Sequence, residues 1–293
     1  MLKKFSTYTF ALLTGIVLFS SCQKEYESIE SIDERLIQEY LTANKLTFVK
    51  DPSGFYYKIT EDGTGSLLTN QDSVLYSYNI KNFTGTVYSA TAANTNEGTY
   101  VGYVNPSSYR GVLTKLKRGG KFTIILPSYL AFGKNGSGSI PSNEIIVSEV
   151  STFPEASQAA LDETRIRAYL TSKNLLPTAV RDPSGVYYII TTAGTGTQVN
   201  NVGSTVTVNY TGRFLDGTVF DSSTDGTFVT PLLSLPGSNG VIKGWGKVIP
   251  KLKVGGKVRM FIPSGLGYGT AAYNAIPANS ILDFDVEVTA VTN

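Results

Sequence analysis

The stretch that decides the fold reads Val206-Thr207-Val208-Asn209-Tyr210-Thr211-Gly212 and is followed by Asp216-Gly217. Apolar and polar residues alternate in it, which predicts a half-buried strand because successive side chains point to opposite faces. The Asp216-Gly217 pair predicts a hairpin turn into the next strand. The same alternation recurs twice later, at Val258, Met260 and Ile262 and at Leu282, Phe284, Val286 and Val288.

One short helix is expected among these strands, over residues 243–252, and Pro250 should limit its length. A single short helix packed against an antiparallel sheet defines an α+β domain.

The chain repeats this scaffold. Residues 51–57 read Asp-Pro-Ser-Gly-Phe-Tyr-Tyr and residues 182–188 read Asp-Pro-Ser-Gly-Val-Tyr-Tyr, so that position 51 returns at 182, an offset of 131. Residues 115–121 return at 251–257, where the offset has grown to 136. A period above 100 residues indicates duplicated domains, since solenoid repeats are about 20–50 residues long. We expect a first domain over residues 48–154 and a second over 179–293.

The composition fits two ordinary domains. With 293 residues, 41% hydrophobic and 16% charged, each domain can bury a core of its own. The formal charge of +2 includes Lys3 and Lys4, and these lie in a segment expected to be removed. The mature chain is then nearly neutral, which argues against a nucleic-acid partner.

The N-terminus resembles a secretory signal peptide over residues 1–21. Two lysines precede an apolar run, residues 10–19, that is too short to span a bilayer. Ser20-Ser21-Cys22 resembles a bacterial lipobox, although Phe19 stands where such boxes usually carry leucine. We expect a lipid on Cys22 and a place in the bacterial cell envelope, at the outer membrane facing the periplasm or the cell surface. The alternative is a plain signal peptide with an incidental Cys22. A single cysteine allows no internal disulfide.

Two helices are expected outside the repeats. Residues 22–47 form a polar tether followed by an amphipathic helix, with apolar residues at Ile29, Ile32, Leu36, Ile37, Tyr40 and Leu41. A linker helix within 155–178 repeats part of this pattern at Ile166, Tyr169 and Leu170. Each helix is expected to dock on its own domain or to bridge the two, and pairing between chains is the alternative.

The residue inventory excludes most hydrolytic chemistry. The chain has no histidine, which removes histidine-dependent triads, histidine-ligated metals and histidine general bases. Cys22 is expected to be acylated, so thiol catalysis is not expected. The alternating acids Asp283, Asp285 and Glu287 fit the solvated face of a strand. We expect no metal and no cofactor, and a function based on apolar and aromatic shape.

A set of short motifs in the second repeat resembles the FKBP-type peptidyl-prolyl cis-trans isomerases. The resemblance covers about residues 182–292. Its motifs, in order, are Tyr210-Thr211-Gly212, Asp216-Gly217, Phe220-Asp221-Ser222-Ser223, Val241-Ile242 with Gly244-Trp245, Tyr268-Gly269, Ile276-Pro277 and Phe284-Asp285-Val286-Glu287. Together they are specific, whereas any one alone is not.

The resemblance implies two tandem FKBP-like domains, each a curled antiparallel sheet of five or six strands around one short helix. It implies catalytic roles for Tyr210, Phe220, Asp221, Ile242, Trp245, Tyr268 and Phe284, and substrate-binding roles for Val241, Phe228, Ile276 and Tyr273. Trp245 would form the pocket floor, and either Phe228 or Leu232 would fill a further apolar position. The Ile242 backbone N–H and the Tyr268 hydroxyl would hold substrate carbonyls. The alternatives are that Trp245 and Phe284 are ordinary core residues and that Asp221 caps a turn.

The function implied is isomerisation of proline-containing polypeptides during the folding of exported proteins. The resemblance also implies binding of macrolide-type inhibitors, with a membrane contact through the lipid on Cys22 and no nucleic acid. The oligomeric state stays open. Two alternatives are a non-catalytic, peptide-binding chaperone and a scaffold lipoprotein of an envelope complex.

The first repeat departs from the motifs at most of the pocket positions. At five pocket positions the first repeat carries Tyr88, Ser89, Tyr109, Phe132 and Ser148, where the second carries, in the same order, Phe220, Asp221, Trp245, Tyr268 and Phe284. It also carries Asn105-Pro106 in place of Val241-Ile242. Pro106 removes a backbone donor, and Ser148 replaces a pocket wall by a small polar group. We predict that the first domain folds like the second but lacks efficient isomerase activity.

Overall fold

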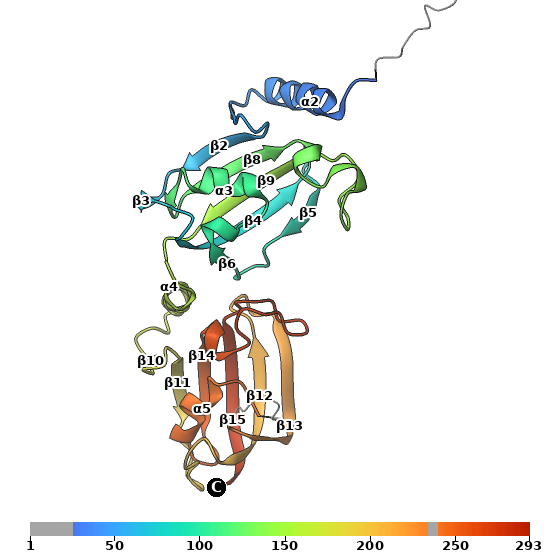
Figure 1. Cartoon of the computed structure of the whole chain (residues 1–293). Helices are drawn as coiled ribbons and strands as arrows, with labels where there is room; N and C mark the ends of the chain where they lie inside the picture. The colour runs from blue at the N-terminus through green and yellow to red at the C-terminus, as the bar shows by residue number, and fades with distance from the viewer. Residues whose placement is uncertain (1–25, 234–239) are drawn as a thin grey trace, which may run out of the picture.

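The computed structural model describes residues 26–233 and 240–293, in which two sheet domains follow one another (Figure 1). The expected signal peptide, residues 1–21, and Cys22 lie outside the described residues. Within the described part, no helix is both long and apolar enough to cross a membrane.

The first domain follows helix α2 (Ile29–Ala43) and builds its sheet in the order β1-β2-β8-β9-β4-β5, with β6 also paired to β4. Its sheet strands are β1 (Val49–Lys50), β2 (Tyr56–Glu61), β4 (Ser73–Lys81), β5 (Val87–Ala90), β6 (Glu97–Tyr100), β8 (Lys121–Leu126) and β9 (Ile146–Thr152). A separate two-stranded ribbon pairs β3 (Thr64–Leu67) with β7 (Lys117–Arg118). The helical segments are α3 (Ser107–Leu113), η1 (Val101–Tyr103), η2 (Ser128–Leu130) and η3 (Gly133–Asn135).

The second domain follows helix α4 (Gln158–Ser172) and has a six-stranded antiparallel sheet in the order β10-β11-β14-β15-β12-β13. The strands are β10 (Val180–Arg181), β11 (Tyr187–Thr192), β12 (Thr205–Arg213), β13 (Val219–Pro231), β14 (Lys257–Ile262) and β15 (Leu282–Thr292). The short helical turns are α5 (Trp245–Val248), η4 (Ile249–Lys251) and η5 (Ser264–Leu266).

The α+β class and the curled antiparallel sheets match the expectation, with two differences. The first sheet has seven strands, because the counterpart of the long strand β13 is broken there into β5 and β6, both paired to β4. The helix expected over 243–252 is shorter and changes type: α5 ends at Val248 and Pro250 lies in the 3-10 turn η4. Proline cannot continue the α-helical hydrogen bonding there.

Each leading helix docks on its own domain through a buried carboxylate. Asp33 Oδ2 of α2 accepts hydrogen bonds from the backbone N–H and the hydroxyl of Ser128, at 2.7 and 2.8 Å. Asp162 Oδ2 of α4 makes the same two bonds with Ser264, at 2.8 and 2.7 Å. Apolar side chains complete both contacts: Ile37 and Leu41 pack with Tyr56 and Ile125, and Ile166 and Leu170 pack with Tyr187 and Phe261.

Helix α4 also contacts the first domain. The Arg165 guanidinium donates to the carbonyls of Asn94 and Thr95 and to the side-chain oxygen of Asn96. Asn279 of the second domain donates from Nδ2 to the Asn96 carbonyl at 2.8 Å. The loop between β5 and β6 is therefore tied both to α4 and to the second domain.

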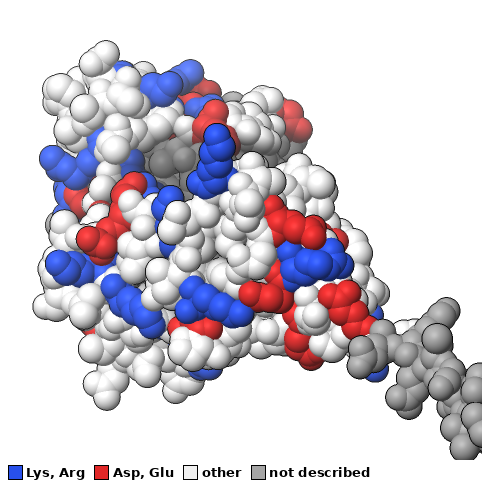
Figure 2. Space-filling model, turned by 90° about the horizontal axis from the view of Figure 1, so that it is seen from above, with Lys and Arg blue, Asp and Glu red and all other residues white. Residues whose placement is uncertain are grey.

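The acids on strand β15 correct one expectation. Asp283 is fully buried rather than solvated, because Arg259 binds it with two nitrogens, at 2.9 and 2.7 Å. Asp285 pairs with Arg213 and Glu287 with Lys257. The numbers of basic and acidic residues are nearly equal, 25 and 23, so most charged side chains can find a partner of opposite charge. Figure 2 shows basic and acidic side chains interspersed over the face seen from above.

Candidate active site

A cavity of about 440 Å³ lies in the second domain between the sheet, helix α5 and the segment after β14. The structure brings most of the expected site residues to it. The lining residues among them are Tyr210, Asp221, Phe228, Val241, Ile242, Trp245, Tyr268, Tyr273 and Phe284. The volume falls within the range typical of pockets for small ligands.

The floor of the cavity is aromatic. Trp245 is 2% exposed, and its ring meets Tyr210 and Phe284 edge to face, with centroid distances of 5.5 and 5.4 Å. Such edge-to-face pairs are a favoured geometry of aromatic side chains. Gly244 allows this arrangement, since a Cβ there would collide with the Ile262 side chain on β14. The close approach of α5 to the sheet thus places the indole at the floor.

A tyrosine and an aspartate form the polar part of one wall. The Tyr210 hydroxyl donates to Asp221 Oδ2 at 2.7 Å, across the pairing of β12 with β13. Burial raises the pKa of Tyr210 above its ordinary value, and the bond to Asp221 raises it further. The phenol therefore stays protonated well above neutral pH and keeps its hydrogen bond to Asp221. Because Asp221 accepts from Tyr210, it is more than a turn cap.

Two further donors face the cavity without an internal partner. Within the described residues, neither the Ile242 backbone N–H nor the Tyr268 hydroxyl forms a hydrogen bond. The Tyr268 ring stacks on Tyr273 with a centroid distance of 4.7 Å and an interplanar angle of 9°. Burial raises the pKa of Tyr268, with smaller contributions from Tyr273 and Asp221. Both groups can donate to a ligand's carbonyl oxygens.

Two of the expected residues do not line this cavity. Phe220 packs behind the wall, with its ring 5.6 Å from Phe284 and 5.1 Å from Phe214. Ile276 is 5% exposed and belongs to the core. Phe228, rather than Leu232, takes the open aromatic position: its ring is 5.0 Å from Tyr210, while Leu232 is buried in the core.

Three lining residues were not foreseen: Gly240, Lys243 and Gly267. Each is next to a motif residue in the chain, namely Val241, Ile242 or Tyr268, and this adjacency is the feature of the sequence that could have predicted them. The motif match rests on side-chain identity and did not select them.

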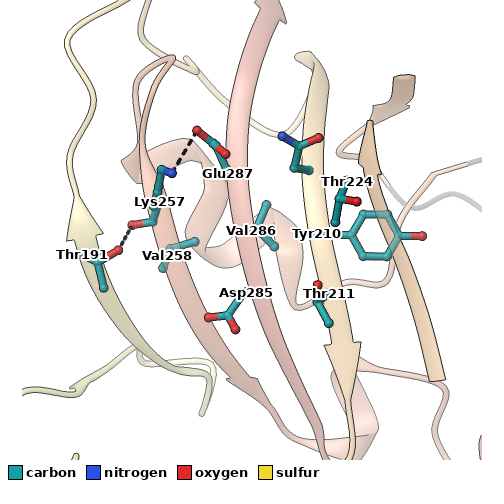
Figure 3. A pocket seen from close by; sticks show the side chains of 10 residues that line it. Thr191, Tyr210, Thr211, Thr224, Lys257, Val258, Asp285, Val286 and Glu287 are labelled. Carbon is teal, nitrogen blue, oxygen red and sulfur yellow. Dashed lines mark hydrogen bonds and ion pairs between the residues drawn. The ribbon is translucent and has the colours of Figure 1, made fainter. Parts of the chain in front are cut away.

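A second, shallower hollow of about 290 Å³ is lined largely from the outer face of the same sheet (Figure 3). Its charged residues are already paired. Lys257 Nζ lies 3.3 Å from Glu287 Oε1, and Asp285 pairs with Arg213. The Thr191 hydroxyl donates to the Lys257 carbonyl. This hollow offers fewer free polar groups than the cavity on the inner face.

Comparison with known proteins places the second domain in a family. Residues 196–289 match the family described as FKBP-type peptidyl-prolyl cis-trans isomerase. The FKBP-type peptidyl-prolyl cis-trans isomerase FkpA of Buchnera aphidicola subsp. Schizaphis graminum is 41% identical over 111 residues, which are 38% of this chain and 42% of that relative. The crystal structure of FkpA from Escherichia coli is 35% identical, with 46% of this chain and 61% of that chain covered at a TM-score of 0.39.

FK506-binding protein 1A of Aspergillus fumigatus is 37% identical over 110 residues, which are 37% of this chain and 96% of that relative. The match to the FkpA of Buchnera aphidicola thus spans 42% of that relative's length, whereas the match to the smaller relative spans 96% of its length. Because the chain matches nearly the whole of this relative at 37% identity, it belongs to the family of FKBP-type peptidyl-prolyl cis-trans isomerases.

Proposed function

We propose that the chain catalyses the cis–trans isomerisation of X–Pro bonds in polypeptides, with its active site in the second domain. The observation that carries this proposal is the cavity itself, in which an aromatic floor, the Tyr210–Asp221 pair and two unpartnered donors surround one space. Macrolide-type inhibitors would compete for the same space.

The chemistry needs neither a nucleophile nor a metal. Amide resonance sets the barrier to X–Pro rotation, about 18–20 kcal/mol, and a dry pocket weakens that resonance by favouring the twisted, less polar amide. The proline ring would lie over Trp245, while the Ile242 N–H and the Tyr268 hydroxyl would hold carbonyl oxygens. Interactions that strengthen only in the twisted geometry lower the barrier.

The cellular setting belongs to the same proposal. A signal peptide over residues 1–21 and a lipid on Cys22 would place the enzyme in the cell envelope, where it would assist the folding of exported proteins. Uncatalysed proline isomerisation takes tens of seconds, long enough to limit folding. Mass spectrometry of the mature N-terminus tests the lipid: an unmodified Cys22 on the purified membrane-fraction protein contradicts the anchor.

The catalytic test uses X–Pro tetrapeptides and the full chain. Asp221→Ala and Phe284→Ala should lower kcat/KM at least tenfold. The matched controls are Ser89→Ala and Ser148→Ala, which change the corresponding positions of the first domain and should leave the rate unchanged. A folded wild-type chain without activity, or equal losses in both pairs, contradicts the proposed site.

A further inference from the structure

The first domain has a cavity of its own, with a volume of about 510 Å³. It lies where the candidate active site lies in the second domain, with Tyr109 of α3 in place of Trp245 of α5. The size again falls in the range of ligand pockets. The two domains therefore differ in the residues that line their cavities rather than in the presence of a cavity.

An exchange of large and small residues keeps this cavity open. In the second domain Gly212 pairs with Phe284, and a Cβ on Gly212 would come within 2.6 Å of the phenyl ring. The same register in the first domain pairs Ile80 with Ser148. Ile80 lines the cavity, whereas Ser148 is fully buried and does not. The wall is therefore apolar, which corrects the expectation that Ser148 replaces it by a small polar group.

The cavity has lost the groups assigned above to holding a proline amide. Pro106 takes the place of Ile242 and has no backbone N–H. Phe132 takes the place of Tyr268 and has no hydroxyl, and a serine stands in place of Asp221. A ligand of this cavity must therefore be recognised by other means.

A different carboxylate has entered the wall. Four residues before Gly212 on β12, Val208 pairs with Phe228, an aromatic residue of the candidate active site. Four residues before the equivalent position on β4, Tyr76 pairs with Glu97, and both line the cavity. Glu97 thus takes the place of a phenyl ring. Among the described residues that line the cavity, it is the only charged one.

The backbone at Glu97 is held in place, while its carboxylate forms no hydrogen bond or ion pair within the described residues. Asn96 is 2% exposed and donates from Nδ2 to the Glu97 carbonyl at 3.1 Å. Gln158 and Asn279 in turn bond to Asn96. The Arg165 guanidinium donates to three oxygens of the loop before β6. The carboxylate is therefore available to a ligand on a strand that is already positioned.

Aromatic residues line the cavity together with this carboxylate, namely Tyr76, Tyr78, Tyr109 and Phe132. Burial, with a smaller contribution from the charge of Glu97, raises the pKa of Tyr76 to about 12. The carboxylate thus lies close to a phenol that stays neutral. Aromatic faces and carboxylates both attract cations, and no lysine or arginine is among the described lining residues. The cavity therefore favours a ligand with a positive charge.

The rest of the wall is apolar and includes Ile80, Leu126 and Ile146. A small inorganic cation would leave this surface uncovered, whereas a cation on an apolar stem would cover it. Arginine has such a stem, and its planar guanidinium stacks on aromatic rings and binds a carboxylate with two N–H groups. The lysine ammonium is a more strongly hydrated point charge. Because the chain belongs to a family of peptidyl-prolyl isomerases, a polypeptide is the source of the side chain that we consider.

We propose that the first domain binds an arginine side chain of a polypeptide segment in this cavity. The guanidinium pairs with the Glu97 carboxylate beside the aromatic residues, and the stem lies along the apolar wall. The site is distinct from the proposed isomerase site and does not depend on its activity.

The test uses the full chain and a fluorescein-labelled hexapeptide with one central arginine and no proline or aromatic residue. The matched peptide carries citrulline, which keeps the shape of arginine and lacks its charge. Fluorescence anisotropy at low salt should show about tenfold tighter binding of the arginine peptide. Trp245, the single tryptophan of the chain, lies in the second pocket. Its emission should therefore stay unchanged when the unlabelled arginine peptide is added.

Two variants, each with a matched control, assign the site. Glu97→Gln should abolish the preference for arginine over citrulline, whereas Glu30→Gln, which removes an exposed carboxylate of α2, should keep it. Phe132→Ala should weaken binding of the arginine peptide about three- to fivefold. Its control is Tyr129→Ala, since Tyr129 is 39% exposed, compared with 37% for Phe132, and does not line the cavity.

Circular dichroism checks the folding of each variant, and Glu97→Gln stays decisive if Phe132→Ala does not fold. Four outcomes overturn the proposal. They are no binding of the arginine peptide, equal affinity of the wild type for the two peptides, a preference for arginine retained in Glu97→Gln, and Trp245 emission that follows binding.

Discussion

Tyr210 donates a 2.7 Å hydrogen bond to Asp221, whereas the corresponding hydroxyls of Tyr78 and Ser89 lie 3.5 Å apart. The strand register makes these pairs equivalent, because Tyr210 pairs with Val286 and Tyr78 with Val150, each two residues beyond the Phe284 and Ser148 positions. The tyrosine is common to both domains. The carboxylate, and with it a charge-assisted hydrogen bond, is found only in the second.

Tyr210→Phe should lower isomerase activity while keeping the aromatic floor. It removes the donor to Asp221 and leaves the carboxylate free to turn in the cavity. A hydrogen bond to a charged group contributes about 1.5–3 kcal/mol, so kcat/KM for X–Pro peptides should fall roughly tenfold or more. Tyr78→Phe is the matched control in the first domain. Unchanged activity in Tyr210→Phe would separate this pair from catalysis.

The first domain should lose stability at alkaline pH through Tyr109. Burial raises its pKa from 10.0 to about 12, so its contribution to the free energy of unfolding is complete below pH 10 and is lost as pH rises through 12. The shift corresponds to roughly 3 kcal/mol. Urea midpoints measured from pH 9 to 12 should therefore fall less steeply for Tyr109→Phe than for the wild type. Tyr103→Phe should follow the wild-type curve.

The sequence predicted what depends on local pattern. Alternation predicted β12, β14 and β15, and Asp216-Gly217 predicted the hairpin, where Gly217 has φ +93°. Most of the expected site residues, though not Phe220 or Ile276, line one cavity. It did not predict the break between β5 and β6. Both strands pair with β4, but each in a different register, and a change of register leaves no mark in the local pattern of residues.

Long-range packing explains the remaining misses. Asp33 contacts Ser128, which is 95 residues away, and the sequence pattern alone marks Asp33 only as a polar position of a helix. The first domain pairs Ile80 with Ser148 where the second pairs Gly212 with Phe284, and this difference cannot be predicted without the strand register. A sequence motif identifies site residues one at a time, whereas the volume of a pocket depends on pairs of residues on neighbouring strands.

The two buried aspartates should stabilise their own domains separately. Asp33→Ala removes two hydrogen bonds to a carboxylate and should destabilise the first domain by about 2–4 kcal/mol. Asp162→Ala should do the same to the second. Residue-resolved amide hydrogen exchange in the full chain distinguishes the domains. Glu30→Ala, at an exposed position of α2, is the control, and protection lost equally in both domains would contradict separate docking.

Arg165 should couple the two domains. Arg165→Ala removes the bonds to Asn94, Thr95 and Asn96 and leaves the apolar docking of α4 on the second domain intact. Small-angle scattering should show a broader distribution of interdomain distances, with isomerase activity unchanged. Arg167→Ala, on the exposed face of the same helix, bonds only within the second domain and is the control. Identical scattering of Arg165→Ala and the wild type would mean that the bonds of Gln158 and Asn279 to Asn96, together with the linker, suffice.

The pairing of a small residue with a large one across strands should be testable as a coupling energy. Gly212→Ile alone places a side chain against the Phe284 and Phe220 rings, where even a Cβ would be 2.6–2.7 Å away, and overpacking of this kind costs about 1–3 kcal/mol. Phe284→Ser alone leaves a cavity. Together they recreate the Ile80–Ser148 arrangement of the first domain, so the double variant should be more stable than the sum of the single effects by about 1–2 kcal/mol. Urea unfolding of the four proteins closes the cycle. Additive effects would show that the exchange does not conserve packing, and the cavity of the first domain would then need another cause.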